Sequence, residues 1–371
     1  MSPTLHPLSL DDIEALAVGA WILGTGGGGS PYLGLLNMRR LYGEGRRVAI
    51  LSPVDLDDRD WVAVVSNMGA PLVGQERLAD SRNIARAVEI QQGLLGARFT
   101  AVMPLEIGGG NAIQPLMAAA HLGLPVVDAD TMGRAYPEAQ MTSVAVGDLR
   151  PYPCVLYDPR GVEAVVTRVP DWRWMERVSR RICVEMGSIA STCKAPRTGR
   201  EIKEWGIHFT LSKAIALGRC VREAQRRHAD PVAAILAEAR GKLLFRGKVL
   251  DVERRTTEGF LRGRALIDGL DEDRGSRLEI AFQNEWIVAW RDGAPLAMSP
   301  DLICVLDTVS GEACGTETIR YGRRVSVAAL PAPPVFLTPK GLAHVGPRAF
   351  GYDLDFRSVF DPPSDQAAAP P

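Results

Sequence analysis

Two kinds of hydrophobic pattern alternate along the first half of the chain. Continuous apolar runs are typical of buried strands, and apolar residues three or four positions apart are typical of helices. The strand pattern occurs in VAILSPV, WVAVVSNMG, TAVMPLEIGGGN and LPVVDAD. The helical pattern follows Ser9, Ser30–Pro31 and Asn111, which are predicted helix starts, and also fills DSRNIARAVEIQQGLLG. This alternation predicts an α/β N-terminal domain with a largely parallel sheet over residues 1–166.

The pattern changes in the second half of the chain. Residues 172–240 predict a helical segment that is interrupted at Pro196 and Gly199. Short strands separated by glycine turns follow, for example in KLLFRGKVLDVERRT and RLEIAFQNEWIVAWRDG. We therefore expect a mixed, β-rich C-terminal domain over residues 167–361, with a barrel or sandwich sheet. Residues 362–371, rich in proline and alanine, are predicted to form a disordered tail.

The composition is that of an ordinary globular protein and limits the classes of partner. Of the 371 residues, 46% are hydrophobic and 23% are charged, and the formal net charge is −1. This balance argues against nucleic acid or an anionic membrane as a partner, and no apolar run is long enough to span a membrane. The six cysteines are irregularly spaced without a C-x-x-C pair, and no secretory signal is recognisable. We expect a cytoplasmic homo-oligomer that acts on a small-molecule substrate.

The segment GTGGGGSP, residues 24–31, is a glycine-rich loop that fits neither familiar phosphate-binding motif. It lacks the lysine of a P-loop, and it follows a helix rather than the strand of a dinucleotide fingerprint, so no nucleotide is expected. Two explanations stay open: tight packing of helices, or backbone N–H groups that bind an anionic or carbonyl-rich ligand. A second cluster, Gly108–Gly110, resembles the first, and both are predicted to line one pocket. The predicted substrate-binding residues are Thr25, Gly26, Gly27, Gly28, Met68, Gly109, Gly110 and Asn111.

Charged residues gather near the second glycine cluster. Glu106 is expected at a strand end, and Asp128 and Asp130 follow the apolar run LPVV on one face of its strand. Converging carboxylates can move protons, so the predicted catalytic residues are Glu106, Asp130, Arg134 and Glu138. The alternative is structural: the two aspartates cap the next helix and Arg134 pairs with one of them.

The same carboxylates could also belong to a metal site. Asp128 and Asp130 with His208 and Cys193 would offer oxygen, nitrogen and sulfur ligands, a set that suits a divalent metal and zinc above all. The alternative is that His208 is a structural histidine and Cys193 an ordinary thiol. Neither H-E-x-x-H nor G-x-S-x-G occurs. The C-terminal domain is predicted to supply one wall of the site, with His208 reaching across.

Several segments together resemble a known family. They are GTGGGGSPYLG, NMGAPLVGQE, EIGGGNAIQPLMAAAHLGLPVVDADTMGRAYPEAQM, FQNEWIVAW, SPDLICVLD and GLAHVGPRAFGYD. They resemble the S-methyl thiohydantoin desulfurase-like family over residues 9–358. The resemblance implies an α/β domain followed by a distinct C-terminal domain, and a hydrolase that cleaves the C–S bond of an S-methylated thiohydantoin. The alternative is a non-catalytic ligand-binding subunit that works with a hydantoinase- or oxoprolinase-type enzyme.

Overall fold

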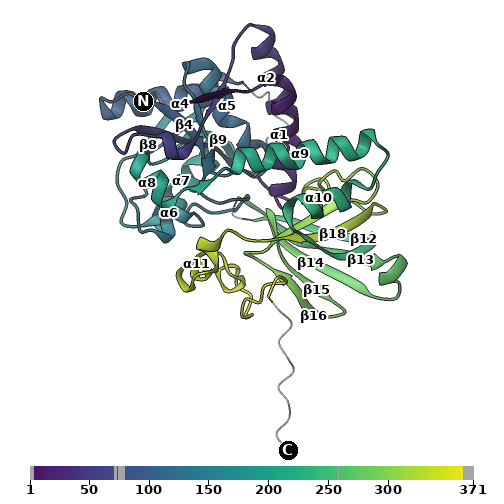
Figure 1. Ribbon diagram of the computed structural model, residues 1–371. Coiled ribbons are helices and arrows are strands. Elements are labelled where there is room, and N and C mark those ends of the chain that lie inside the picture. Colours follow the sequence, from purple (N-terminus) through teal and green to yellow (C-terminus); the bar gives the residue numbers. More distant parts are fainter. Residues whose placement is uncertain (1–3, 71–72, 74–79, 258, 362–371) are drawn as a thin grey trace, which may run out of the picture.

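A computed structural model describes residues 4–70, 73, 80–257 and 259–361 (Figure 1). A nine-stranded sheet forms the centre of the N-terminal half. Its strands, in spatial order, are β1 (Leu5–Pro7), β2 (Ala49–Leu51), β5 (Val126–Val127), β4 (Ala101–Pro104), β3 (Trp61–Gly69), β9 (Ile189–Cys193), β7 (Cys154–Asp158) and β8 (Val162–Val166), and β10 (Arg197–Thr198) also pairs with β3. The predicted α/β class is thereby confirmed.

The sheet is mixed, with the expected parallel strands at its centre and antiparallel strands on both sides. Strands β2, β5, β4 and β3 pair in parallel, as expected for strands joined by helical crossovers. Strands β1, β9, β7, β8 and β10 all pair antiparallel. The parallel strands carry the loops that build the site, because ligands of such sheets lie beyond the strands' carboxyl ends.

The helices of the first half follow the predicted pattern, but their caps differ. They are α1 (Leu10–Leu23), α2 (Tyr32–Gly43), α4 (Arg82–Leu95), α5 (Gln114–Leu122) and the short α6 (Ser143–Val146). Ser9 caps α1 through the predicted capping box with Asp12. Asn111 does not cap α5, whose N-cap is Ile113, and the cap position of α2 is Pro31 rather than Ser30. The amide of Asn111 is thus free for another use.

The segment predicted as helical contains strands as well. Its helices are α7 (Trp172–Glu185), α8 (Gly199–Trp205), α9 (Thr210–Arg226) and α10 (Pro231–Ala239). Between them lie β9 and β10, which complete the first sheet, and β11 (Ile207–His208), which pairs with β6 (Ala129–Asp130). The first sheet therefore takes strands from both sides of residue 166.

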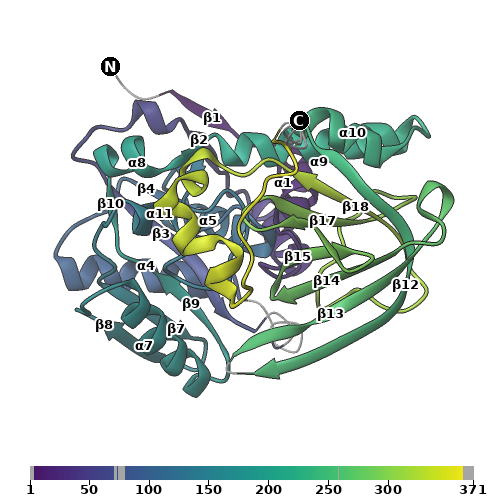
Figure 2. The same cartoon turned by 90° about the horizontal axis from the view of Figure 1, so that it is seen from below.

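The C-terminal half contains one antiparallel sheet of seven strands, which curves around its core (Figure 2). In spatial order they are β16 (Ala294–Met298), β15 (Glu285–Arg291), β14 (Arg277–Gln283), β13 (Phe260–Gly269), β12 (Lys242–Thr257), β18 (Arg324–Leu330) and β17 (Leu302–Asp307). Helix α11 (Pro339–Val345) follows. The β-rich character is confirmed, and the sheet is a single open one rather than a sandwich or a closed barrel.

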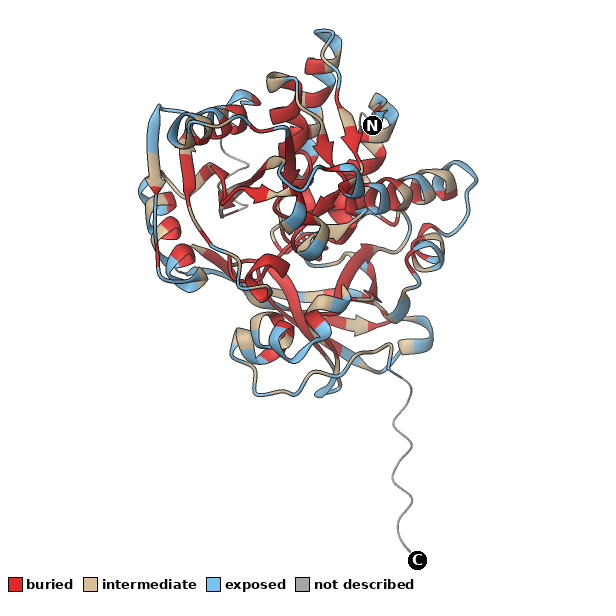
Figure 3. Cartoon of the chain, turned by 60° about the vertical axis from the view of Figure 1, so that its left-hand side comes forward, coloured by how far each residue is buried: buried red, intermediate tan, exposed pale blue. Residues whose placement is uncertain are grey.

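Buried residues run continuously from one half to the other (Figure 3). One apolar cluster joins α1 and α9 to residues of β17 and β18. The first glycine loop forms backbone links to the second half: Trp286 N–H donates to Thr25 O at 2.8 Å, and Thr316 N–H donates to Gly26 O at 2.8 Å. No helix among the described residues is long and apolar enough to cross a bilayer. The predicted tail, residues 362–371, lies outside the described part of the chain.

Candidate functional site

A cavity of about 500 Å³ lies where the loops at the ends of β3 and β4 meet the C-terminal sheet. Its walls come from both glycine loops, the end of β3, residues 132–139, β9, α7 and the turn between β14 and β15. A volume of this size is typical of pockets that bind small molecules. The prediction that the two glycine loops line one pocket is confirmed, since Gly28 and Gly110 both face it.

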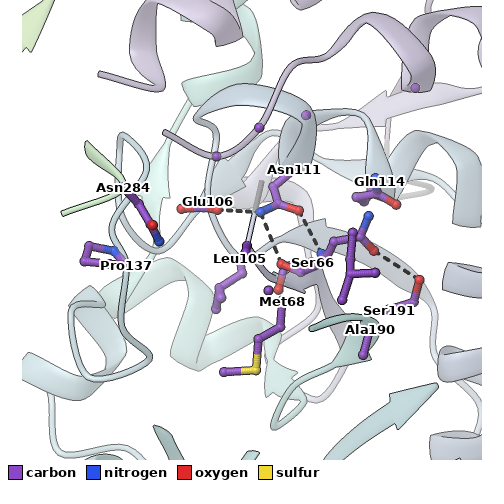
Figure 4. A pocket seen from close by; sticks show the side chains of 18 of the residues that line it. Ser66, Met68, Leu105, Glu106, Asn111, Gln114, Pro137, Ala190, Ser191 and Asn284 are labelled. Atoms are coloured by element: carbon purple, nitrogen blue, oxygen red, sulfur yellow. Dashed lines mark hydrogen bonds between the residues drawn. The ribbon is translucent and has the colours of Figure 1, made fainter. Parts of the chain in front are cut away.

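Glu106 is a buried carboxyl group in the wall of this cavity, directly beyond β4. Its Oε1 accepts a hydrogen bond from Asn111 Nδ2 at 2.5 Å (Figure 4). Its Oε2 accepts one from Tyr136 N–H at 3.1 Å. Asn111 is fixed in turn, because its Oδ1 accepts from Asn67 N–H at 2.7 Å. Burial raises the pKa of Glu106 to about 7, although these hydrogen bonds act against the shift. Near neutral pH this group can therefore either accept or release a proton.

A second carboxyl group, Glu285, enters the cavity from the first residue of β15. Burial, and then the nearby charge of Glu106, raise its pKa well above the ordinary value. Its Oε2 has no hydrogen-bond partner among the described residues. The raised pKa favours the protonated form of Glu285. Two buried carboxyl groups that face one cavity and both have raised pKa values are candidates for an acid–base pair.

The glycines allow two backbones to touch beside these carboxyl groups. Gly110 N–H donates to Gly28 O and Gly29 O, at 3.1 and 2.8 Å. A Cβ atom on Gly28 would lie 2.4 Å from Gly108 O, and one on Gly109 would lie 2.6 Å from Gly29 O. The two glycine loops therefore pack tightly against each other, and their edges also line the cavity. Ligand binding by their backbone N–H groups stays a prediction.

Amide and hydroxyl side chains also line the cavity. Asn67, Gln114, Asn284 and Ser191 line it, and Asn284 faces the Glu106 side of the cavity in Figure 4. Asn284 Oδ1 accepts from Leu261 N–H at 2.9 Å, which fixes the orientation of its amide. Side-chain amides offer both donors and acceptors, so this wall suits a neutral ring with C=O and N–H groups.

Helix α7 holds the loop that carries Glu138. Arg180 Nε donates to Glu176 Oε1 at 2.7 Å, its Nη2 donates to Pro137 O at 2.8 Å, and Glu176 Oε2 accepts from Ala139 N–H at 2.9 Å. Glu138 lines the cavity, and its two oxygens accept from side-chain amides of Gln140 and Gln283. Of the predicted site residues, the cavity is lined by Glu106, Glu138, Gly28, Met68, Gly110 and Asn111.

The predicted metal ligands are not brought together. Asp128 accepts from Leu211 N–H and from the Ser212 N–H and hydroxyl, at the start of α9. The ring of His208 bonds to Ile202 O at 3.0 Å, and Cys193 Sγ lies 2.8 Å from Gln91 Oε1. No group of three histidine, cysteine, aspartate or glutamate side chains in the described segments could hold a metal ion. His208 and Cys193 thus fit the structural alternative, whereas Asp128 caps α9 and not the next helix along the chain. This ligand set supports no step through a metal.

Asp130 and Arg134 brace the site from outside the cavity. Asp130 Oδ2 accepts from Ile107 N–H and Gly133 N–H, both at 2.8 Å, which ties the Glu106 loop to the next turn. Burial raises the pKa of Asp130 to about 7. Arg134 is fully buried and donates to Thr25 Oγ1 at 2.6 Å and to three carbonyl oxygens of the C-terminal half. Arg134 therefore joins the halves and does not pair with the aspartates as the structural alternative had it. Four of the predicted substrate-binding residues do not line the cavity: Thr25, Gly26, Gly27 and Gly109.

The prediction that the C-terminal domain supplies a wall is confirmed, but by residues other than His208. Asn284, Glu285 and Thr318 supply it, and Lys194 adds a buried cation from the end of β9. Glu285 and Lys194 are not among the site residues predicted from the sequence. A signal existed for Glu285, since a glutamate within the apolar segment FQNEWIVAW is out of place in a buried strand. Nothing in STCKAP distinguishes Lys194 from a surface lysine.

Comparison with known proteins gives matches over almost the whole chain. One family model, described as the S-Me-THD-like N-terminal domain, matches residues 11–168, and another, described as the S-Me-THD-like C-terminal domain, matches residues 170–359. A crystal structure of a protein from Chromobacterium violaceum, determined by a structural genomics consortium, has a TM-score of 0.75 at 24% identity. The match covers 91% of this chain and 94% of that one, and it shows a shared fold. The comparison with curated proteins found no match.

Proposed function

The chain belongs to the S-Me-THD-like family, and on this premise we propose that it hydrolyses the C–S bond of an S-methyl thiohydantoin. Water replaces the methylthio group on the ring carbon, which yields a hydantoin and methanethiol. One bond from carbon to oxygen forms and one from carbon to sulfur breaks. Of the two protons of water, one ends on the ring nitrogen and the other on sulfur.

The observation that carries the proposal is the environment of Glu106. A general base works best when its pKa lies near the working pH, and burial brings the pKa of Glu106 to about 7. Asn111 and Tyr136 N–H each hold one of its oxygens, which fixes the carboxylate at the cavity wall. In the proposed reaction Glu106 takes a proton from the attacking water.

Glu285 is the acid partner in this scheme. Because its pKa is raised well above the ordinary value, it keeps a proton that it can give to the ring nitrogen as water attacks the adjacent carbon. The side-chain amides of Asn67 and Asn284 would bind the ring's carbonyl and N–H groups. Loss of the methylthio group then leaves the carbonyl of the hydantoin.

The test is turnover by the purified chain alone. The protein is incubated with an S-methyl thiohydantoin, the unmethylated thiohydantoin and a hydantoin, while free thiol and product mass are followed. We expect thiol release from the first compound only, and a loss of at least about 100-fold in kcat/KM for Glu106→Gln, the usual contribution of a general base. Glu279→Gln, a change to a half-exposed carboxylate on β14 that does not line the cavity, is the control and should keep full activity. Ligand binding without thiol release would refute the hydrolase and favour the binding-subunit alternative.

A further inference from the structure

Lys194 lines the cavity but has no part in the steps derived so far. Its residue is only 6% exposed, and its backbone N–H donates to Val64 O at 2.7 Å. In the part of the chain that the structure describes, no carboxylate forms an ion pair with its ammonium group, and Nζ lies 4.0 Å from Met68 Sδ. Burying an ammonium group without a paired carboxylate costs several kcal/mol. A lysine buried in this way in a cavity wall indicates a functional role.

The surroundings of this ammonium group are apolar and rich in sulfur. Met68 lines the cavity, and its sulfur lies below the Glu106–Asn111 pair in Figure 4. Cys154 belongs to the same apolar cluster as Met68, and Lys194 opposes the rise in the pKa of its thiol that burial causes. Thioether sulfur is polarizable and packs well against other soft groups. This end of the cavity therefore suits a methylthio group better than it suits a polar ring edge.

We infer that Lys194 donates the proton that the departing sulfur takes, with the methylthio group seated against Met68. This role rests on the proposed hydrolysis. Expelling a thiolate into an apolar pocket would create a buried anion, which has a high desolvation free energy. A proton donor beside the sulfur avoids this, because the leaving group then departs as a neutral thiol. The ammonium is the nearest acid to the Met68 sulfur that the contacts show.

The proton balance closes with the groups present. Water attack moves one proton from water to Glu106 and one from Glu285 to the ring nitrogen. When the intermediate collapses, its hydroxyl proton returns to Glu285, the C–S bond breaks, and the sulfur takes a proton from Lys194. Glu106 then holds one extra proton and Lys194 lacks one. Both groups line the cavity, and the charge of Lys194 lowers the pKa of Glu106. Passage of this proton from Glu106 to Lys194 through solvent in the cavity restores both groups.

The rival explanation is that Lys194 binds a carboxylate on the substrate. The two roles respond differently to the acidity of the leaving thiol and to replacement by arginine. A poor leaving group such as methanethiolate needs protonation, whereas 4-nitrothiophenolate does not. Arginine keeps the positive charge but does not give up a proton, so it can replace an anion-binding lysine and not a proton donor.

The experiment compares Lys194→Met and Lys194→Arg with the unmodified protein on two substrates with the same ring. One carries a methylthio group and the other a 4-nitrophenylthio group. We expect Lys194→Met to lose at least about 100-fold in kcat on the methylthio compound and less than about threefold on the nitrophenyl compound. Lys194→Arg should not restore the first rate. Glu279→Gln serves again as the control, and thermal unfolding verifies that each variant is folded.

Each other outcome overturns the role of Lys194. Equal losses on both substrates, or full rescue by arginine, would assign Lys194 to anion binding. If the variants do not fold, the unmodified protein still decides, because a series of arylthio leaving groups should show only a weak dependence of kcat on thiol acidity. A steep dependence would mean that no proton donor acts at the sulfur. Absence of any thiol release by the unmodified protein would instead refute the proposed function itself.

Discussion

Replacing Glu106 with glutamine removes the group whose titration should control both activity and stability. Glu106 lies in the cavity wall, where Asn111 and Tyr136 N–H hold its two oxygens. The glutamine side chain keeps the shape and loses the charge. The unmodified protein and Glu106→Gln therefore differ in one ionisation.

The size of the effect follows from the pKa. Burial raises the pKa of Glu106 from 4.5 to about 7, and a shift of about 2.5 units corresponds to roughly 3 kcal/mol. The folded state binds the proton more tightly than the unfolded state, so the free energy of unfolding falls as pH rises from 4.5 to about 7. Relative to the unmodified protein, Glu106→Gln should therefore gain roughly 3 kcal/mol between these pH values. Because the ionised form is the base, kcat/KM of the unmodified protein should fall about tenfold per pH unit below 7.

The assays are urea unfolding and kcat/KM from pH 4.5 to 8. Glu317→Gln is a matched control: burial also raises the pKa of Glu317 to about 7, but its side chain does not line the cavity. It should reproduce the change in stability and keep the activity profile. Asn111→Ala removes a donor that lowers the pKa of Glu106, so the acid limb should move to higher pH by roughly one unit.

Two results would refute this reasoning. A kcat/KM that is constant from pH 5 to 8 would mean that Glu106 is not the base. A stability difference between the unmodified protein and Glu106→Gln that does not change with pH would mean that the buried carboxyl does not titrate in this range.

Two further predictions concern the scaffold around the cavity. Arg134→Met removes the donor to Thr25 Oγ1 and to the carbonyl oxygens of Pro300, Asp301 and Trp286, so we expect the free energy of unfolding to fall by roughly 3 kcal/mol or more. If urea unfolding gives a value within about 1 kcal/mol of the unmodified protein, Arg134 does not brace the two halves. Gly109→Ala places a Cβ 2.6 Å from backbone atoms at a φ of +65°, and it should lower the free energy of unfolding more than Gly29→Ala does. At Gly29 the φ is +75° but nothing lies within 4 Å of the added Cβ, so only the backbone strain of about 1–2 kcal/mol is expected. Equal losses of stability in the two variants would mean that the loops are not in tight contact.

The fold could be predicted wherever a local pattern decides the structure. The apolar runs gave the parallel strands β2, β3, β4 and β5, and the Ser9 capping box gave the start of α1. Strand β9 was missed because IASTC is short and lies inside a helical region. Its pairing with β3 is a long-range contact, and no local pattern encodes such a contact.

The same limit explains which site residues could be found from the sequence. Glu106 and Asn111 adjoin the second glycine cluster, so the sequence places them near a strand end and a loop. The predicted metal ligands were chosen because they lie close together in the sequence or are residue types that bind metals. In the fold their side chains bond to other protein groups instead: Asp128 accepts from N–H groups at the start of α9, and the His208 ring bonds to a carbonyl oxygen of α8. Residue type and spacing describe what a side chain can bind. Only the fold decides which partner is within reach.

The acid–base pair depends on the docking of the two halves. Glu106 comes from a loop of the N-terminal half and Glu285 from β15, and the charge of Glu106 raises the pKa of Glu285. The pKa of Glu285 is raised by burial, and that burial exists only when the first glycine loop lies against it: a Cβ on Gly27 would be 2.0 Å from Glu285 Oε1. Two sets of hydrogen bonds hold this loop against β15. Trp286 N–H donates to Thr25 O, and the guanidinium of Arg134 donates to both Thr25 Oγ1 and Trp286 O. Because residues 1–166 contain neither Glu285 nor Lys194, a fragment that ends there has the base but neither proton donor, and it should release no thiol.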